Sequence, residues 1–291
     1  MRPSVKNISF LDDCVSADIT KQFLKLVPTG VDFNSEDTEV IYTHFHKINY
    51  VSYQNLKVVV CPCRGISHIL DGKPDGVEVI YLEKSDELEL FNKAVSLAEW
   101  TVSSLLKLLI NDNENLLGKK VGFIGFNRVA QQVAYRLSNF DVSMSYFSPE
   151  TPNVEMFISN NSIKQLSSVK LICNTSDIII MGLDDKETYS NFISEPAFAE
   201  MKDVYFINPF RAKHVCGEDL RAAFDCDNVK GFAIDDLDGY GMETVSDLIV
   251  LGTIPHTNCF VTTHKAGKGY ISRLNTDIMV LNKLEKLLTG K

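Results

Sequence analysis

Short apolar runs alternate with longer amphipathic stretches along the chain. In the first third, apolar runs at residues 5–11, 39–43, 56–61 and 77–82 are bounded by Asp, Gly and Pro, which indicates short β-strands. From residue 86 to 110, Leu and Ala recur at spacings of three and four, as on the buried face of a helix. This pattern predicts an α/β domain followed by a long helix.

The remainder of the chain alternates more regularly. Runs that are apolar without interruption are typical of parallel strands covered by helices on both faces. We predict strands at residues 121–125, 142–147, 176–183, 203–210, 229–235 and 258–264, and helices at residues 128–140, 195–202, 217–225 and 270–290. The sequence therefore predicts an α/β protein, with a doubly wound parallel sheet after a first α/β domain.

Composition limits the kinds of partner that the protein can bind and indicates its cellular compartment. The 291 residues suffice for two domains, and the net charge of −9, with acids and bases interspersed, argues against nucleic-acid binding. No apolar run is long enough to span a membrane, and Asp12 and Asp13 interrupt the N-terminal segment where a signal peptide would be apolar. Seven scattered cysteines are typical of reduced thiols, so we expect a cytoplasmic protein that binds neither nucleic acid nor membrane.

Two pairs of residues are of types that can bind metals, and we interpret both pairs as structural. Cys61 and Cys63 form a C-x-C pair at the end of an apolar run, which suits a metal or redox site or simply two thiols at a strand end. We favour the thiols. His44 and His46 would share one face of a strand, and with no third ligand nearby in the sequence we expect them to be structural. No metal site is predicted.

Residues 121–137, VGFIGFNRVAQQVAYRL, resemble a dinucleotide-binding loop between a strand and a helix. That loop uses three glycines, for the tight turn, for close approach of the pyrophosphate and for helix packing. Gly125 retains the first, Asn127 replaces the second, and alanine stands at the third. We expect the Asn127 amide and the Arg128 guanidinium to donate to phosphate, and we assign Val129 to the same degenerate loop.

The end of the next predicted strand bears on the choice of cofactor. An acidic residue about 20 positions after the loop commonly binds the ribose hydroxyls of NAD. Ser148 stands there, and its lack of charge would admit the 2′-phosphate of NADP, whereas Glu150 lies close by. The sequence therefore predicts NAD or NADP without deciding between them.

Together with later motifs, this loop makes the chain resemble the D-isomer-specific 2-hydroxyacid dehydrogenases over nearly its whole length. The motifs are NLKVVVCPCRGISHI (55–69), AVSLAEWTVSSLLKLL (94–109), SDIIIMGLDDKETYSNFI (176–193), MKDVYFINPFRAKHV (201–215), VKGFAIDDLDGYG (229–241) and NCFVTTHKAG (258–267). The resemblance implies two Rossmann-like domains with a cleft between them. Residues 1–93 with 267–291 would form the substrate domain, residues 94–266 the dinucleotide-binding domain, and two chains a homodimer.

The resemblance also implies site residues. Arg211, in an N-x-x-R motif, would bind the carboxylate and carbonyl of a 2-keto acid, for which a planar guanidinium is suited. His264, in an H-x-A-G motif, would transfer the proton, and Asp235 would hold the nicotinamide amide. The backbone near three further residues would bind the other side of the carboxylate: Arg64, Gly65 and Ile66.

One departure from the family concerns proton transfer. The family has a catalytic glutamate that orients the histidine, and residue-by-residue alignment places Tyr240 there. A tyrosine hydroxyl has a reference pKa of about 10 and carries no charge at neutral pH. Asp238 or Glu243 would have to replace that glutamate, although each is more typical of a solvated loop acid.

Two functions therefore remain open. The first is an NAD(P)-dependent oxidoreductase acting on a small 2-keto or 2-hydroxy acid, with Arg211, His264 and Tyr240 in the catalytic positions. The second is a catalytically weakened relative that binds a nucleotide or metabolite as a regulatory or partner protein. Retention of Arg211 and His264 favours the first, whereas the altered loop and Tyr240 favour the second.

Overall fold

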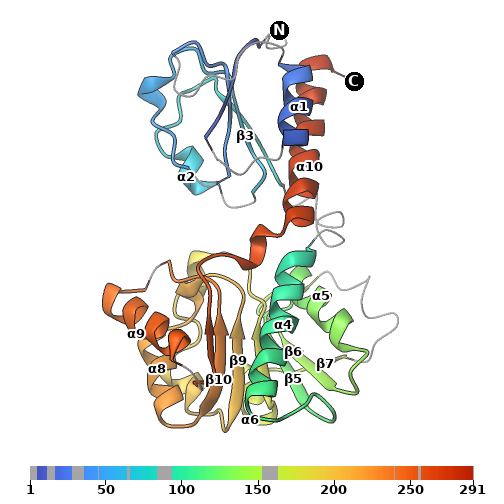
Figure 1. Ribbon diagram of the computed structural model, residues 1–291, viewed down its shortest axis with the longest axis vertical. Helices are drawn as coiled ribbons and strands as arrows, with labels where there is room; N and C mark the ends of the chain where they lie inside the picture. The colour runs from blue at the N-terminus through green and yellow to red at the C-terminus, as the bar shows by residue number, and fades with distance from the viewer. Residues whose placement is uncertain are drawn as a thin grey trace. The chain divides into compact units, whose positions relative to one another are not determined.

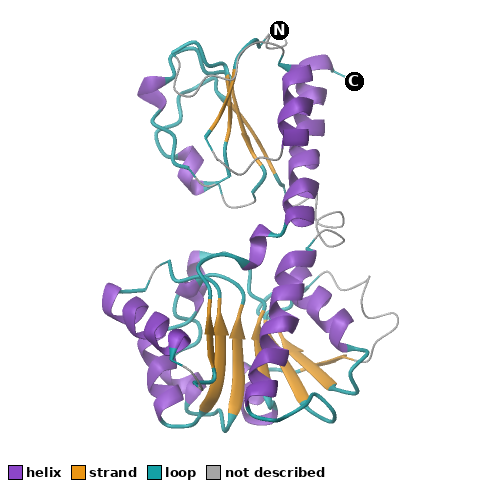
Figure 2. Cartoon of the chain, viewed as in Figure 1, coloured by secondary structure: helices purple, strands orange, loops and turns teal. Residues whose placement is uncertain are grey.

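The computed structural model describes residues 5–11, 17–27, 36–44, 46–63, 66–83, 94–152, 163–238, 240–254 and 257–290. The chain divides into two compact units, Met1–Lys93 with Tyr270–Lys291, and Ala94–Gly269 (Figure 1). Each unit is built on one parallel sheet flanked by helices (Figure 2). The predicted α/β class with two Rossmann-like units is confirmed.

The first unit has a four-stranded parallel sheet in the order β1-β2-β3-β4. Its strands are β1 (Ile8–Phe10), β2 (Val40–Tyr42), β3 (Val58–Cys61) and β4 (Glu78–Tyr81). Its helices are α1 (Ala17–Leu26), η1 (Tyr50–Ser52), α2 (Ser67–Leu70) and α10 (Tyr270–Thr289). The C-terminal helix α10 packs with α1 on one face of this sheet, and apolar side chains bury both faces.

The second unit has seven parallel strands in the order β11-β10-β9-β8-β5-β6-β7. The strands are β5 (Lys120–Ile124), β6 (Ser143–Phe147), β7 (Ile163–Gln165), β8 (Ile178–Met181), β9 (Val204–Asn208), β10 (Val229–Ile234) and β11 (Cys259–Val261). The helices are α4 (Val95–Asn111), α5 (Arg128–Leu137), α6 (Val169–Thr175), η3 (Glu187–Tyr189), α7 (Glu195–Phe198), η4 (Ala212–His214), α8 (Gly217–Asp225), α9 (Met242–Thr253) and η5 (Ala266–Lys268). Within the described residues, no helix is long and apolar enough to cross a membrane.

Helices cover both faces of the seven-stranded sheet. Side chains of α4 and α5 pack on one face, and those of α6, α7, α8 and α9 pack on the other. Every residue of β8 and β9 is buried, which explains why their sequences are apolar without alternation. The strand order reverses between β5 and β8, and ligands bind in such folds at the carboxyl edge of the sheet beside this point.

Candidate active site

The turn after β5 lies at the point where the strand order reverses. Gly125 has a φ of +82°, in the left-handed region that favours glycine. A Cβ at this position would lie 2.3 Å from the backbone carbon of Gly182, which follows β8. Asn127 N donates to Gly182 O at 3.1 Å and ties the two loops together. Only glycine therefore fits at position 125 without displacing the neighbouring loop.

Asn127 makes contacts that differ from those expected of it. Its Oδ1 accepts hydrogen bonds from Val129 N and Ala130 N, both at 3.1 Å, so it caps the N-terminus of α5. Its Nδ2 donates to Leu183 O at 3.1 Å rather than pointing to open space. The side chain thus already satisfies two of the first three N–H groups of the helix, which are the groups that bind phosphate at such a terminus.

The loops that follow β6 and β8 are joined through Glu150. Its Oε1 accepts hydrogen bonds from Lys186 Nζ and from the Tyr189 hydroxyl. Burial and the Glu150 carboxylate raise the pKa of Tyr189 to about 12. Ser148, directly after β6, is half-buried. The acid nearest the expected ribose position is therefore Glu150, and the protein's own side chains already pair with it.

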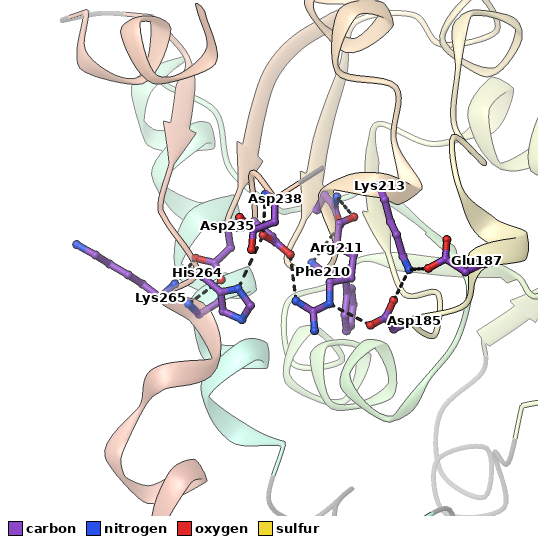
Figure 3. Close-up of polar contacts among 12 residues, drawn as sticks. Asp185, Glu187, Phe210, Arg211, Lys213, Asp235, Asp238, His264 and Lys265 are labelled. Carbon is purple, nitrogen blue, oxygen red and sulfur yellow. Dashed lines mark hydrogen bonds and ion pairs between the residues drawn. The ribbon is translucent and has the colours of Figure 1, made fainter. Parts of the chain in front are cut away.

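Arg211 lies beyond the end of β9 on a turn fixed by Asn208. The side chain of Asn208 accepts from Phe210 N at 3.0 Å and donates to Arg211 O at 3.2 Å. The guanidinium reaches two carboxylates. Its Nε lies 3.2 Å from Asp185 Oδ2 (Figure 3), and its Nη1 lies 3.4 Å from Asp236 Oδ2. Burial lowers the pKa of Arg211, but the two acids outweigh it and the net shift is upward.

Asp185 links Arg211 to a second cation. Lys213 Nζ lies 2.9 Å from Asp185 Oδ1 and 2.6 Å from Glu187 Oε1 (Figure 3). Burial alone would raise the pKa of Asp185, but Lys213 and Arg211 hold it below its usual range. The next residue, His214, is fully buried, and neither ring nitrogen has a hydrogen-bond partner within the described residues.

Asp235 holds the loop that carries His264. Its Oδ1 accepts from Thr262 Oγ1 and from Lys265 N at 2.6 Å, and its Oδ2 accepts from Ala266 N at 2.9 Å. His264 N also donates to Asp235 O at 2.5 Å, and His264 has a φ of +54°. A left-handed residue other than glycine costs about 1–2 kcal/mol, so these bonds keep the histidine in an otherwise unfavourable conformation.

Asp236 lies between Arg211 and His264 and was not singled out from the sequence. It is buried directly after β10, with Oδ2 3.4 Å from Arg211 Nη1 and Oδ1 3.8 Å from His264 Nδ1. Arg211, Asp236 and His264 follow the adjacent strands β9, β10 and β11. The register of three parallel strands therefore gathers them at one edge, which residue spacing alone does not reveal.

The structure corrects the expected place of Tyr240. Its hydroxyl is buried and has no hydrogen-bond partner within the described residues, so it does not bond to His264. The ring packs in the core formed with α8 and α9, close to Gly217, where a Cβ would approach Tyr240 Cδ1 to 3.1 Å. Burial raises the pKa of Tyr240 above its ordinary value. This residue is part of the core rather than the partner of the histidine.

The first unit holds the remaining candidates. Arg64 and Gly65 lie outside the described residues, and Ile66 is half-buried at the start of α2. His44 is buried and His46 is exposed, so they do not share a face as expected.

A buried polar cluster surrounds His44. Its Nε2 lies 3.1 Å from Asp277 Oδ1 of α10, its Nδ1 lies 2.9 Å from Arg273 Nη2, and Tyr42 donates to the same Asp277 oxygen. The thiols of Cys61 and Cys63 donate to His44 O. Because these contacts join β2 and β3 to α10, they account for His44 and both thiols as structural residues.

The loop after β5 has the main features that binding of a dinucleotide requires. Gly125 leaves the turn free of a side chain, the ten-residue helix α5 directs its N-terminus toward the loop, and Arg128 supplies a cation there. Asn127 reduces the number of N–H groups that a pyrophosphate would find unbonded. The residues therefore fit a nicotinamide dinucleotide, with a phosphate contact altered at one position.

Comparison with known families agrees with this geometry. The model of the NAD-binding domain of D-isomer-specific 2-hydroxyacid dehydrogenases matches residues 80–266. That range contains the altered loop and all three of Arg211, Asp236 and His264. The expectation of an NAD-binding domain is confirmed.

Two curated proteins are similar over part of the chain. A protein of Bacillus subtilis (strain 168) named as the 2-hydroxyacid dehydrogenase YoaD is 28% identical over 66% of this chain and 53% of its own length. A glyoxylate reductase of Thermofilum pendens is 34% identical over 41% of this chain and 35% of its own length. The matched region thus spans about half of the first relative and about a third of the second.

A solved structure is similar over nearly the whole chain. The D-lactate dehydrogenase of Aquifex aeolicus, complexed with NAD and lactic acid, superimposes with a TM-score of 0.76 at 17% identity. The match covers 98% of this chain and 96% of that one. At this identity the likeness establishes the fold.

Proposed function

Because the chain belongs to the D-isomer-specific 2-hydroxyacid dehydrogenases, we propose that it interconverts a small 2-keto acid and its 2-hydroxy acid. When bound, a reduced nicotinamide cofactor supplies a hydride, with its two electrons, to C2 of the keto acid. His264 supplies the proton to the carbonyl oxygen. One keto acid, one NADH or NADPH and one proton then give one hydroxy acid and one oxidised cofactor.

The observation that carries this proposal is the position of Arg211 and His264 on the two oxygens of one buried carboxylate, Asp236. A guanidinium and an imidazole held this close suit a substrate with a carboxylate beside a carbonyl. Arg211 Nη2 makes no hydrogen bond within the described residues and offers two N–H groups to such a substrate. Binding of the far side by residues 64–66 stays a prediction.

We propose positions for the parts of the cofactor along the sheet edge. Arg128 and the N-terminus of α5 would hold the pyrophosphate beside Gly125 and Val129. Ser148 and Glu150 would lie near the adenosine ribose. Asp235, whose Oδ2 accepts one hydrogen bond from the protein, keeps capacity to accept a nicotinamide amide.

The expected homodimer has a candidate surface in the second unit. A groove of about 770 Å³ lies between α4 and α5, and its lining includes Leu106, Ile110, Tyr135 and Phe140. Ile110 is 70% exposed and Tyr135 is 58% exposed, which is unusual for large apolar side chains on one patch. We propose that a second copy of the chain covers this groove. Light scattering tests this by measuring the molar mass of the protein in solution.

A cytoplasmic location stays a prediction.

Nicotinamide fluorescence tests the oxidoreductase proposal. NADH and NADPH are titrated into the pure protein, and a panel of small 2-keto acids is then added while cofactor oxidation is followed. We expect one cofactor to bind and at least one keto acid to oxidise it. Arg211→Ala should lower kcat/KM about 100-fold or more, because it removes the anchor of the substrate carboxylate.

Arg221→Ala is the matched control, since Arg221 pairs with Asp225 on the surface of α8. It should leave turnover unchanged. If a cofactor binds but no keto acid oxidises it, and Arg211→Ala changes nothing, the chain is instead a nucleotide-binding regulatory or partner protein. The capped loop at Asn127 is the feature of the structure that favours this second function.

A further inference from the structure

Asp236 is held in one position by its neighbours. Its side chain is only 5% exposed, and its Oδ1 accepts a hydrogen bond from Asp238 N at 3.0 Å. The same oxygen lies 3.8 Å from His264 Nδ1, and Oδ2 lies 3.4 Å from Arg211 Nη1. A buried carboxylate fixed by a backbone N–H and an arginine is placed to act on the histidine beside it.

We propose that Asp236 is the positioning residue of His264 in this chain, orienting its ring and stabilising its protonated form in place of a carboxylate at position 240. This inference deepens the proposed oxidoreductase function and rests on it for its kinetic part. With Nδ1 facing Asp236, the proton exchanged with a substrate is carried on Nε2. A distance of 3.8 Å becomes a hydrogen bond with a movement of about 1 Å, and such contacts commonly tighten when substrate binds.

The other candidates for this role are less well placed. The Tyr240 hydroxyl is buried in the core and bonds to nothing within the described residues. Asp235 uses its carboxylate to accept three hydrogen bonds from the loop of residues 262–266. Asp238 has a carboxylate oxygen within 4.8 Å of both an Asp236 oxygen and a His264 ring nitrogen, but it is exposed, so solvent screens its charge.

The charges near His264 favour the same assignment. The groups in this region are Asp235, Asp236, Asp238, Arg211 and Lys265. The Lys265 side chain extends away from the site in Figure 3, whereas Arg211 points toward it. Asp236 is the buried acid between the two cations that the reaction uses. Its negative charge therefore offsets the repulsion that Arg211 would exert on a protonated His264.

Sharing of Asp236 between two residues gives the proposal a specific kinetic signature. Asp236→Asn removes the charge that holds the histidine and also loosens one of the two ion pairs on Arg211. We therefore expect kcat to fall about tenfold or more, while KM for the keto acid stays the same or decreases. Asp236→Glu, which retains the carboxylate, should recover part of kcat. A rise in KM with kcat unchanged would show that Asp236 serves only to hold Arg211, and the proposal would be wrong.

A second measurement does not depend on activity. Histidine ring signals are followed by NMR across pH in the cofactor-free protein, and the His264 signal is identified by its loss in His264→Gln. Asp236→Asn should move the His264 titration toward lower pH, and Asp236→Glu should leave it close to that of the wild type. If no keto acid is turned over but the titration moves, the positioning role stands and the oxidoreductase proposal fails. An unmoved titration overturns the positioning role.

Two rival variants make the test selective. Asp238→Asn removes a neighbouring exposed acid, and Tyr240→Phe removes only the unpartnered hydroxyl. We expect either variant to change kcat and the His264 titration by less than a third of the effect of Asp236→Asn. A larger effect from either variant would assign the role to that residue. Circular dichroism confirms that each variant is folded before these values are compared.

Discussion

The two halves of the sheet edge in the second unit differ in how far they satisfy their own polar groups. At the ends of β9, β10 and β11, Arg211 and His264 lie beside a buried acid, and Arg211 Nη2 makes no hydrogen bond within the described residues. At the ends of β5, β6 and β8, Asn127 caps the helix that would bind phosphate, and Glu150 is paired with Lys186 and Tyr189. The half to which we assign proton transfer therefore already has its side chains together, whereas in the half to which we assign the cofactor the polar groups bond to one another.

This difference indicates where a ligand must displace contacts of the protein. A substrate carboxylate can use the remaining N–H groups of Arg211 without breaking an ion pair. A pyrophosphate at α5 must compete with Asn127 Oδ1 for Val129 N and Ala130 N. We therefore expect this sequence to weaken binding of the cofactor rather than the proposed proton transfer by His264.

The largest effect should come from filling the turn after β5. Gly125→Ala places a methyl group 2.3 Å from the Gly182 backbone and keeps a positive φ. We expect the free energy of unfolding to fall by about 3 kcal/mol or more, combining the backbone cost with overpacking. Gly118→Ala is the control, since Gly118 has a φ of +77° with nothing within 4 Å. Equal losses in urea unfolding would mean that the Gly182 contact is unimportant.

The second effect is on the cofactor half alone. Asn127→Gly removes the cap and restores the glycine of the dinucleotide loop, so two N–H groups become accessible to phosphate. We expect NADH to bind about fivefold more tightly, equivalent to about 1 kcal/mol, and stability to fall by only a few tenths of a kcal/mol. Fluorescence titration measures the first change and urea unfolding the second.

Ser168→Gly is the matched control, because Ser168 caps α6 through Leu171 N. It should cost similar stability and leave NADH binding unchanged. Weaker NADH binding in Asn127→Gly would show instead that the asparagine amide turns to hold the phosphate, as the sequence alone suggested.

Much of the architecture follows from the sequence because its strands are buried on both faces. The apolar runs of β5, β8, β9 and β10 stand out against their flanking turns, and the leucine spacing of α4 marks a long helix. Helix α9 was not predicted. It buries Leu248 and Leu251 but also exposes Ile249 and Val250, so its apolar residues do not mark one face. Helix α1 buries Ile19 and Phe23, a four-residue spacing too short to stand out.

The sequence indicated two residues of the candidate site but not the side chains with which they interact. The order of the family motifs indicated Arg211 and His264, which stand at the ends of predicted strands. Alignment by position led to Tyr240, because a sequence does not show that this side chain turns into the core against Gly217. Asp236 becomes visible only when the register of β9, β10 and β11 brings its carboxylate between the other two residues. Distances across strands are set by packing, which single-sequence patterns do not record.

The smallest effect concerns His214, which ends η4 after β9 and whose ring lies beside that of Tyr189. Burial lowers the pKa of His214, against the opposing influence of Asp185 and Asp184, while Lys213 and Arg211 lower it further. The unfolded chain therefore binds a proton below about pH 6.5 that the folded chain does not, so stability decreases as pH falls through this range. If the ring stays neutral in the folded state, the free energy of unfolding is lower at pH 6 than at neutral pH by at most about 0.8 kcal/mol.

His214→Phe retains a flat ring in the buried site and removes the titration. Urea unfolding at pH 7.5 and pH 6 should show a smaller loss of stability in the variant than in the wild type, by up to that amount. The variant should also be at least as stable at pH 7.5, because the ring nitrogens it replaces have no hydrogen-bond partner within the described residues. If both proteins lose stability equally, other histidines account for the pH dependence. In that case His214 contributes to packing alone.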